Sequence, residues 1–96
     1  MTTNEPRMPE WIYSGQRTAD VAAFVTRAGV LRAVWLTAPT GNNAQLDLDD
    51  GGTDLLNLAV PSSGSVLFVL PQPIPFLTDL GSDLTGTNAS YGVWFE

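Results

Sequence analysis

The chain has 96 residues, with four Arg and no Lys against ten acidic residues, a net charge of −6, and neither His nor Cys. This length supports a single domain with a modest core. Because no basic face can be built, neither nucleic acid nor an anionic membrane surface is an expected partner. The missing imidazole, thiol and amine groups leave few routes to catalysis. We therefore expect no enzyme, no catalytic residue, no cofactor and no metal.

The low share of charged residues indicates that other protein covers part of the surface. Only 15% of the residues are charged, whereas about 25% is usual in globular domains. All four arginines lie within the first third of the chain. This asymmetry predicts that the N-terminal third meets an acidic surface, such as that of a neighbouring copy. No apolar run exceeds five residues, so we expect no membrane-spanning segment.

The first 13 residues predict an extended N-terminal arm, residues 1–13, in front of one β-domain over residues 14–96. Residues 1–10 are polar and include two prolines, whereas residues 11–13 (WIY) are too apolar to remain in water. The arm is therefore expected to dock on a neighbouring surface. Nearby arginines are available to pair with acidic groups there.

Two strands are expected before residue 38. Residues 21–26 are apolar and partly β-branched, which favours a strand, although residues 18–27 also partly fit a helical period. Residues 30–37 are apolar on both faces, and Leu31, Ala33 and Trp35 share one of them. That pattern predicts a central strand or a strand that lies against a partner.

A hairpin is expected in the middle of the chain. Residues 45–49 (QLDLD) alternate, which predicts a strand with its leucines buried and its polar side chains in water. The sequence DGG at 50–52 supplies the positive φ angles of a hairpin turn. The acidic residues 47–54 resemble a calcium loop, but no Glu closes the loop at its twelfth position. We interpret them as solvated carboxylates at the hairpin tip.

The second half of the chain predicts three more strands. Residues 65–70 (SVLFVL) predict a buried strand, and the prolines of 71–75 predict a crossover or an edge that holds no sheet ladder. Residues 80–85 form a short strand, and residues 89–95 alternate almost to the last residue, which ties that end into a sheet. Seven to eight short strands at roughly ten-residue spacing predict an all-β fold, an antiparallel β-sandwich or jelly-roll-like domain.

Two tryptophans do not follow from core alternation. Trp94 shares a strand face with Ser90 and Glu96, and Trp35 lies on the strand that is apolar on both faces. Tryptophan is enriched in interfaces. Two interpretations therefore stay open, packing at the edge of the core and an interface or ligand platform. The candidate contact residues are Arg7, Trp11, Ile12, Tyr13, Arg17, Trp35 and Trp94.

Four segments follow one another in a suggestive order. They are residues 31–36 (LRAVWL), 44–52 (AQLDLDDGG), 64–76 (GSVLFVLPQPIPF) and 84–96 (LTGTNASYGVWFE). This order resembles that of small β-sandwich virion proteins of tailed bacteriophages, and the resemblance covers residues 29–96. Asp83 departs from the pattern because it stands inside an expected strand, where we expect it to weaken strand pairing.

The resemblance implies a non-enzymatic structural protein located in the virion, of the capsid decoration or cement type. Such a protein would bind the shell as an oligomer, most simply a trimer. Its partners would be its own copies and the major capsid protein or another virion protein. Three alternatives stay open. They are a sugar- or ligand-binding β-module that uses Trp35 and Trp94, a phage tail or head–tail connector component, and a subunit adaptor of bacterial origin.

Overall fold

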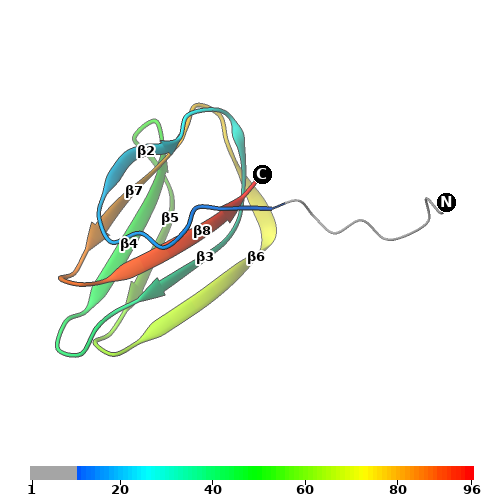
Figure 1. Ribbon diagram of the computed structural model, residues 1–96. Coiled ribbons are helices and arrows are strands. Elements are labelled where there is room, and N and C mark those ends of the chain that lie inside the picture. Colours follow the sequence, from blue (N-terminus) through cyan, green and yellow to red (C-terminus); the bar gives the residue numbers. More distant parts are fainter. Residues whose placement is uncertain (1–10) are drawn as a thin grey trace.

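The computed structural model describes residues 11–96, which form eight strands and, within that range, no helix (Figure 1). The strands are β1 (Ile12–Tyr13), β2 (Val21–Val25), β3 (Gly29–Thr37), β4 (Ala44–Asp50), β5 (Thr53–Val60), β6 (Ser65–Phe76), β7 (Leu80–Thr85) and β8 (Ser90–Phe95). The expected antiparallel β-sandwich is confirmed, and so is the interpretation of residues 21–25 as a strand. Within the described residues no helix is long and apolar enough to cross a membrane.

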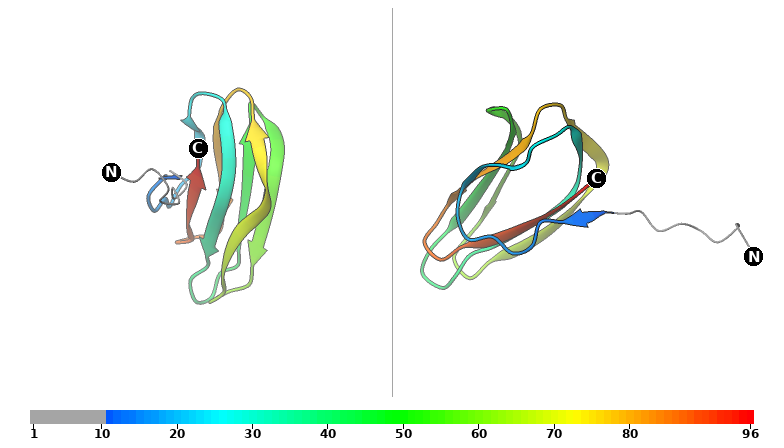
Figure 2. Two further views of the ribbon diagram at one scale, coloured as in Figure 1. Left: turned by 90° about the vertical axis from the view of Figure 1, so that its right-hand side faces the viewer. Right: turned by 45° about the horizontal axis from the view of Figure 1, so that its top comes forward.

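The strands form two four-stranded sheets that stack as separate layers (Figure 2). Sheet A has the order β1-β8-β3-β6, and sheet B has the order β2-β7-β4-β5. Neighbouring strands are antiparallel throughout. Only the β4–β5 hairpin stays within one sheet, and every other connection between described strands crosses from one sheet to the other. Each sheet is therefore assembled from segments that lie far apart in the sequence.

The core lies between the two sheets and follows the alternation of the strands. Leu46 and Leu48 of β4 are fully buried, and they stand opposite Leu58 and Leu56 of β5. The final strand buries every second residue in the same way, so the predicted alternation is confirmed at both places. The backbone N–H and C=O of Glu96 exchange hydrogen bonds with Val30, which ties the last residue to β3. The largest fully buried side chains are Tyr91, Phe76, Leu31, Leu36, Leu46, Leu48, Leu80, Val34 and Val93.

Strand β3 is central, as its two apolar faces predict, but one of its side chains points the other way. The register is irregular between Leu31 and Ala33 on both of its neighbours. This bulge places Leu31 in the core with Val34 and Leu36, and it leaves Ala33 on the outer side. The predicted grouping of Leu31 with Ala33 and Trp35 is wrong, because an extra residue in a strand reverses the facing of the residues before it.

Strand β6 is an edge strand, so the buried strand expected at 65–70 is only half buried. Leu67 is 63% exposed and Val69 is 53% exposed, because no second layer formed by the described residues covers the outer side of sheet A. The prolines that follow do not end the ladder either. Pairing with β3 resumes at Ile74 and continues to Phe76, since an edge strand needs only part of its backbone N–H groups for its one neighbour.

Asp83 does not weaken the pairing of β7, which lies between β2 and β4 in sheet B. Its side chain points outward into water, opposite Asp47 of β4. The inward side of β7 carries Leu80 and Ser82, both buried. The Ser82 hydroxyl pairs with the Tyr91 hydroxyl of sheet A, so one of the few polar contacts in the core links the two layers.

Candidate functional site

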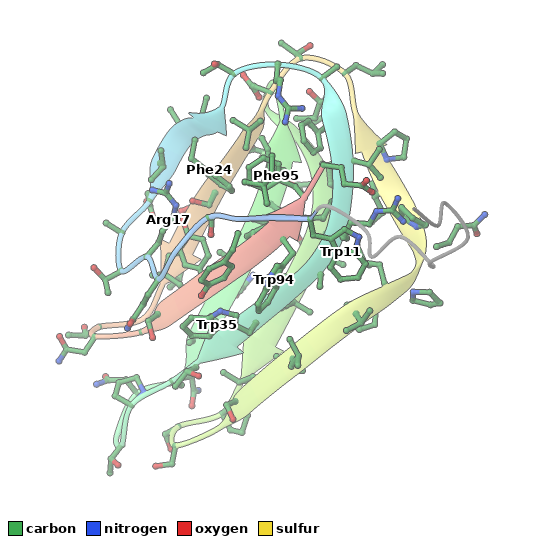
Figure 3. The ribbon with its side chains drawn as sticks, turned by 45° about the vertical axis from the view of Figure 1, so that its right-hand side comes forward. Trp11, Arg17, Phe24, Trp35, Trp94 and Phe95 are labelled. Atoms are coloured by element: carbon green, nitrogen blue, oxygen red, sulfur yellow. The ribbon has the colours of Figure 1, made fainter. Side chains whose placement is uncertain are left out.

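The outer surface of sheet A carries four large aromatic side chains, which we call the aromatic face. Trp11 and Tyr13 come from the N-terminal segment, Trp35 comes from β3 and Trp94 comes from β8. Trp35 and Trp94 stand outward because their chain neighbours on both sides point into the core. The three tryptophans lie along the same side of the sheet (Figure 3).

The aromatic face is held together by direct contacts between its members. Tyr13 stands opposite Trp94 in the β1–β8 register. Their rings stack with centroids 4.6 Å apart at an interplanar angle of 28°, a geometry that adds roughly 0.5–1.5 kcal/mol beyond area burial. The Trp35 indole Nε1 donates a hydrogen bond to the Tyr13 hydroxyl over 2.8 Å. These side chains are therefore preorganised rather than free to turn.

Gly92 makes this arrangement possible because it lies beneath the Trp35–Tyr13 hydrogen bond. Gly92 stands opposite Trp35 in the β3–β8 register. A Cβ at this position would overlap with Trp35 Nε1 and would lie 2.5 Å from the Tyr13 hydroxyl oxygen. The absent side chain is thus what lets the two polar tips meet over β8.

Trp11 closes one end of the aromatic face. The Arg32 guanidinium lies 5.8 Å from the Trp11 ring centroid and forms an ion pair with the Glu96 carboxylate, so it is neutralised. Trp11 and Trp94 also line a shallow groove of about 160 Å³ together with Ala33, Leu67 and Val69. The lining residues are all apolar or aromatic. The groove can accept an apolar side chain, and it offers no acid, base or nucleophile for chemistry.

The remaining sequence candidates lie elsewhere. Ile12 stands opposite Phe95 and is 46% exposed. The Arg17 guanidinium lies 4.8 Å over the Phe24 ring. Arg17 Nε is buried with no acceptor inside the described part of the chain. Arg7 lies outside the described residues. Of the predicted contact residues, the structure therefore brings together Trp11, Tyr13, Trp35 and Trp94.

Sequence reasoning missed the aliphatic part of this surface. Leu67 and Val69 belong to a run that is apolar at every position, and only knowledge that β6 is an edge strand separates its buried side from its exposed side. Gly92 was missed as well. Its place in the interior of the alternating segment 89–95, two residues before the outward-facing Trp94, is the signal that could have identified it, because an interior strand glycine often marks a close approach.

The outer surface of sheet B carries aspartates instead of aromatic side chains, and we call it the acidic face. Asp47 stands opposite Asp83, and Asp49 stands opposite Asp54. Partial desolvation, followed by the charge of Asp79 and other neighbouring carboxylates, raises the pKa of Asp49. The charge of Asp20 is the main cause that raises the pKa of Asp83. These carboxylates therefore repel one another.

Asp50 has a different role in the acidic hairpin. Its carboxylate accepts hydrogen bonds from the backbone N–H groups of Leu77, Thr78 and Asp79 at 2.7, 2.9 and 3.1 Å. These bonds lower the pKa of Asp50, and they fix the loop between β6 and β7 against the β4–β5 turn. No group of three or more acidic residues within 11–96 is arranged to hold a metal ion.

A second hollow lies at the end of sheet B near the 38–43 connection. It has a volume of about 420 Å³ and is lined by neutral residues. The lining residues are Asn43, Ala44, Gln45, Ala59, Val60, Pro61 and Thr85. It contains neither an aromatic ring nor a charged group, so the aromatic face remains the stronger candidate.

Comparison with known proteins adds no relative. No family model matches the sequence, no curated protein matches it, and no solved structure matches the fold.

Replacing Gly92 with Ala is expected to separate Trp35 from Tyr13 and to loosen β1. We expect a loss of roughly 1–3 kcal/mol in the free energy of unfolding, the usual cost of forcing an atom into filled space, together with a change in tryptophan emission of the folded protein. Urea unfolding followed by fluorescence measures both. Ser90→Ala, on the same face of β8, is the control and should stay within about 0.5 kcal/mol. Equal midpoints for G92A and wild type would contradict this reading of the site.

Repulsion between the carboxylates of the acidic face predicts that the free energy of unfolding is largest at mildly acidic pH. The pKa values of Asp49 and Asp83 are raised in the folded protein, so the folded state gains stability as the pH falls through these raised pKa values. The gain is complete once the pH is below 3.8, the ordinary pKa of aspartate. The lowered pKa of Asp50 has the opposite sign. Its stabilisation is present above 3.8 and is lost as pH falls further.

Thermal unfolding measured from neutral to strongly acidic pH tests this expectation. As the pH is lowered from neutrality, the unfolding temperature should first rise. It should then fall once the pH is below 3.8, the ordinary pKa of aspartate. Asp83→Asn should flatten the rise, whereas Asp50→Asn should flatten the fall. An unfolding temperature that decreases steadily from neutral pH would show that the acidic face does not repel itself as inferred.

Proposed function

We propose that this protein is a non-enzymatic structural protein of a bacteriophage virion, of the capsid decoration or cement type. It would bind the shell as an oligomer through the aromatic face. The observation that carries the binding role is the outward-facing, preorganised set of Trp11, Tyr13, Trp35 and Trp94, of which Tyr13 is 42% exposed and the three tryptophans are partly exposed. The virion assignment is supported by the sequence resemblance over residues 29–96.

A partly exposed aromatic surface of this kind favours a protein partner. Large contiguous apolar patches are rare on monomeric proteins and commonly mark interaction sites. Covering the patch would contribute roughly 25 cal/mol per Å² of apolar area. The stacked Tyr13–Trp94 pair and its hydrogen bond to Trp35 are ordered before binding. Less conformational entropy is therefore lost when a partner arrives.

The distribution of charge favours a neutral partner surface on the side of sheet A. The four strands of sheet A contain one charged residue, Arg32, which is paired with Glu96. The strands of sheet B contain five aspartates and no basic residue. A shell surface or another copy can therefore approach sheet A without meeting an uncompensated charge.

The placement of the carboxylates supports a binding role rather than catalysis. The acidic residues stand on an open sheet surface or at turns, and neither of the two hollows is lined by a carboxylate. A pair of carboxylates that hydrolyses a glycoside must flank a bound substrate. The aromatic groove holds no such pair.

The proposed function is tested by following the chain in particles of the phage that encodes it. The chain should co-purify with virions through a density gradient at constant stoichiometry. Trp94→Ala should lower its occupancy by at least about tenfold, because interface tryptophans commonly contribute 2 kcal/mol or more. Leu77→Ala is the control, since Leu77 is 79% exposed and lies outside the aromatic face.

Three outcomes would contradict the proposal. The chain could be absent from purified virions, or the W94A variant could occupy particles as fully as the wild type. The third is specific binding of a glycan by monomeric protein that W94A abolishes, which would instead support the sugar-binding alternative. Thermal unfolding of each variant establishes that a loss of binding is not a loss of fold.

A further inference from the structure

Strand β6 leaves a long, uncharged edge at the end of sheet A. Among the strands within residues 11–96 its one neighbour is β3, and none of its twelve residues is charged. Native edge strands are usually short, charged, bulged or interrupted by proline, which prevents pairing with other chains. The prolines at 71, 73 and 75 protect the second half of β6. The first half, Ser65–Leu70, has no such protection.

The other sheet edges of the described chain are short or carry a charged residue. Strand β1 has two residues, and β2 has five with an irregular register against β7. Strand β5 carries Asp54. Asp54 lies near the β4–β5 turn. Asp50 ties this turn to residues 77–79, which follow the C-terminal end of β6. These carboxylates therefore lie far from Ser65–Leu70, which itself carries no charged residue.

Side-chain packing along the same segment is incomplete. Leu67 and Val69 are mostly exposed on the outer side. On the inner side, Val66, Phe68 and Leu70 pack against the core but are only partly buried. Six consecutive residues thus combine a free backbone edge with apolar surface on both sides, and a further strand placed beside them would cover both.

We infer that Ser65–Leu70 pairs antiparallel with the same segment of a second copy, which joins the two A sheets into one continuous eight-stranded sheet. A second copy is the fitting occupant because antiparallel pairing of identical strands is self-complementary about a two-fold axis. No like charges meet along the segment, although the whole chain carries a net charge of −6. Among the described residues, the strand aspartates lie on sheet B, Asp79 lies just beyond the far end of β6, and Glu96 is paired with Arg32.

The direction of the two-fold axis determines which surfaces the pair presents. An antiparallel pairing within one sheet requires an axis perpendicular to that sheet. Both aromatic faces then lie on one side of the pair, and both acidic faces lie on the other. This point rests on the proposed function, because two coplanar aromatic faces would bind one shell surface with the added strength of a bivalent contact. The unit in solution is then a dimer rather than the trimer that the resemblance implies.

The inference is tested on the isolated full-length chain by sedimentation equilibrium, from about 1 to about 500 µM. The wild type should form a dimer and nothing larger. Leu67→Lys should raise the dissociation constant at least about tenfold, because the two introduced charges would lie close together on the same side of the joined sheet and would repel each other. Leu77→Lys adds the same charge to an exposed leucine outside β6 and should leave the constant unchanged. An equimolar mixture of L67K and L67E should restore the dimer.

Hydrogen exchange at low and high protein concentration distinguishes edge pairing from contact through the aromatic faces. Edge pairing should slow exchange of the amides in Ser65–Leu70 as the concentration rises, with no change in β4 and β7. A strict monomer over the whole range, a trimer or open polymer, or a dimer whose β6 amides exchange unchanged would overturn the inference. A monomer that still occupies virions would leave the proposed function intact, and a dimer that never occupies them would remove that function alone.

Discussion

The position of β8 between β1 and β3 is the contact on which both the core and the aromatic face depend. Its inward residues Tyr91 and Val93 are fully buried, and the Tyr91 hydroxyl reaches Ser82 in the opposite sheet. Its outward side provides Trp94 for stacking on Tyr13 and the empty space at Gly92. One strand therefore contributes to the core and to a contact between the two layers, and it also assembles the surface that we assign to binding.

Separation of charge between the two sheets determines how that surface can be used. Every aspartate that lies on a strand belongs to sheet B, where partial desolvation and then neighbouring carboxylates raise the pKa of Asp49, and the charge of Asp20 raises the pKa of Asp83. The strands of sheet B carry no arginine that offsets this charge, and each described arginine lies over an aromatic ring, at Phe24 of β2, Phe95 of β8 or Trp11. Partners of either kind, a shell or a second copy, therefore meet least repulsion at sheet A.

Much of the fold could be predicted from local pattern, because half-buried antiparallel strands alternate visibly. The spacing of the leucines in 45–49 predicts a buried side, and the DGG sequence predicts a hairpin turn. The alternation of 89–95 predicts a strand with one buried side. Residues 30–37 and 65–70 show what local pattern cannot settle. Both are apolar on two faces, yet one is the centre of sheet A and the other is its edge. The bulge at Leu31 and Ala33 could not be predicted either, since it depends on the partner strands.

The candidate site could be predicted in its residues but not in its geometry. Trp35 and Trp94 are identifiable because they do not fit the core alternation, and Trp11 and Tyr13 because they end a polar segment. Their meeting depends on pairing between the first and last strands of the chain, which no short-range signal specifies. The same pairing between the first and last strands explains why Trp11 and Tyr13, which we expected to dock on a neighbouring surface, contact sheet A of their own chain.

The most direct test of the role assigned to sheet A is chemical footprinting of the free and the particle-bound protein. Hydroxyl radicals modify exposed aromatic and aliphatic side chains, and carbodiimide coupling modifies exposed carboxylates. We predict that modification of Trp35, Trp94 and Leu67 falls several-fold on binding, whereas labelling of Asp47, Asp54 and Asp83 is unchanged. Protection of the aspartates with the tryptophans still fully reactive would contradict the account and would place the partner on sheet B.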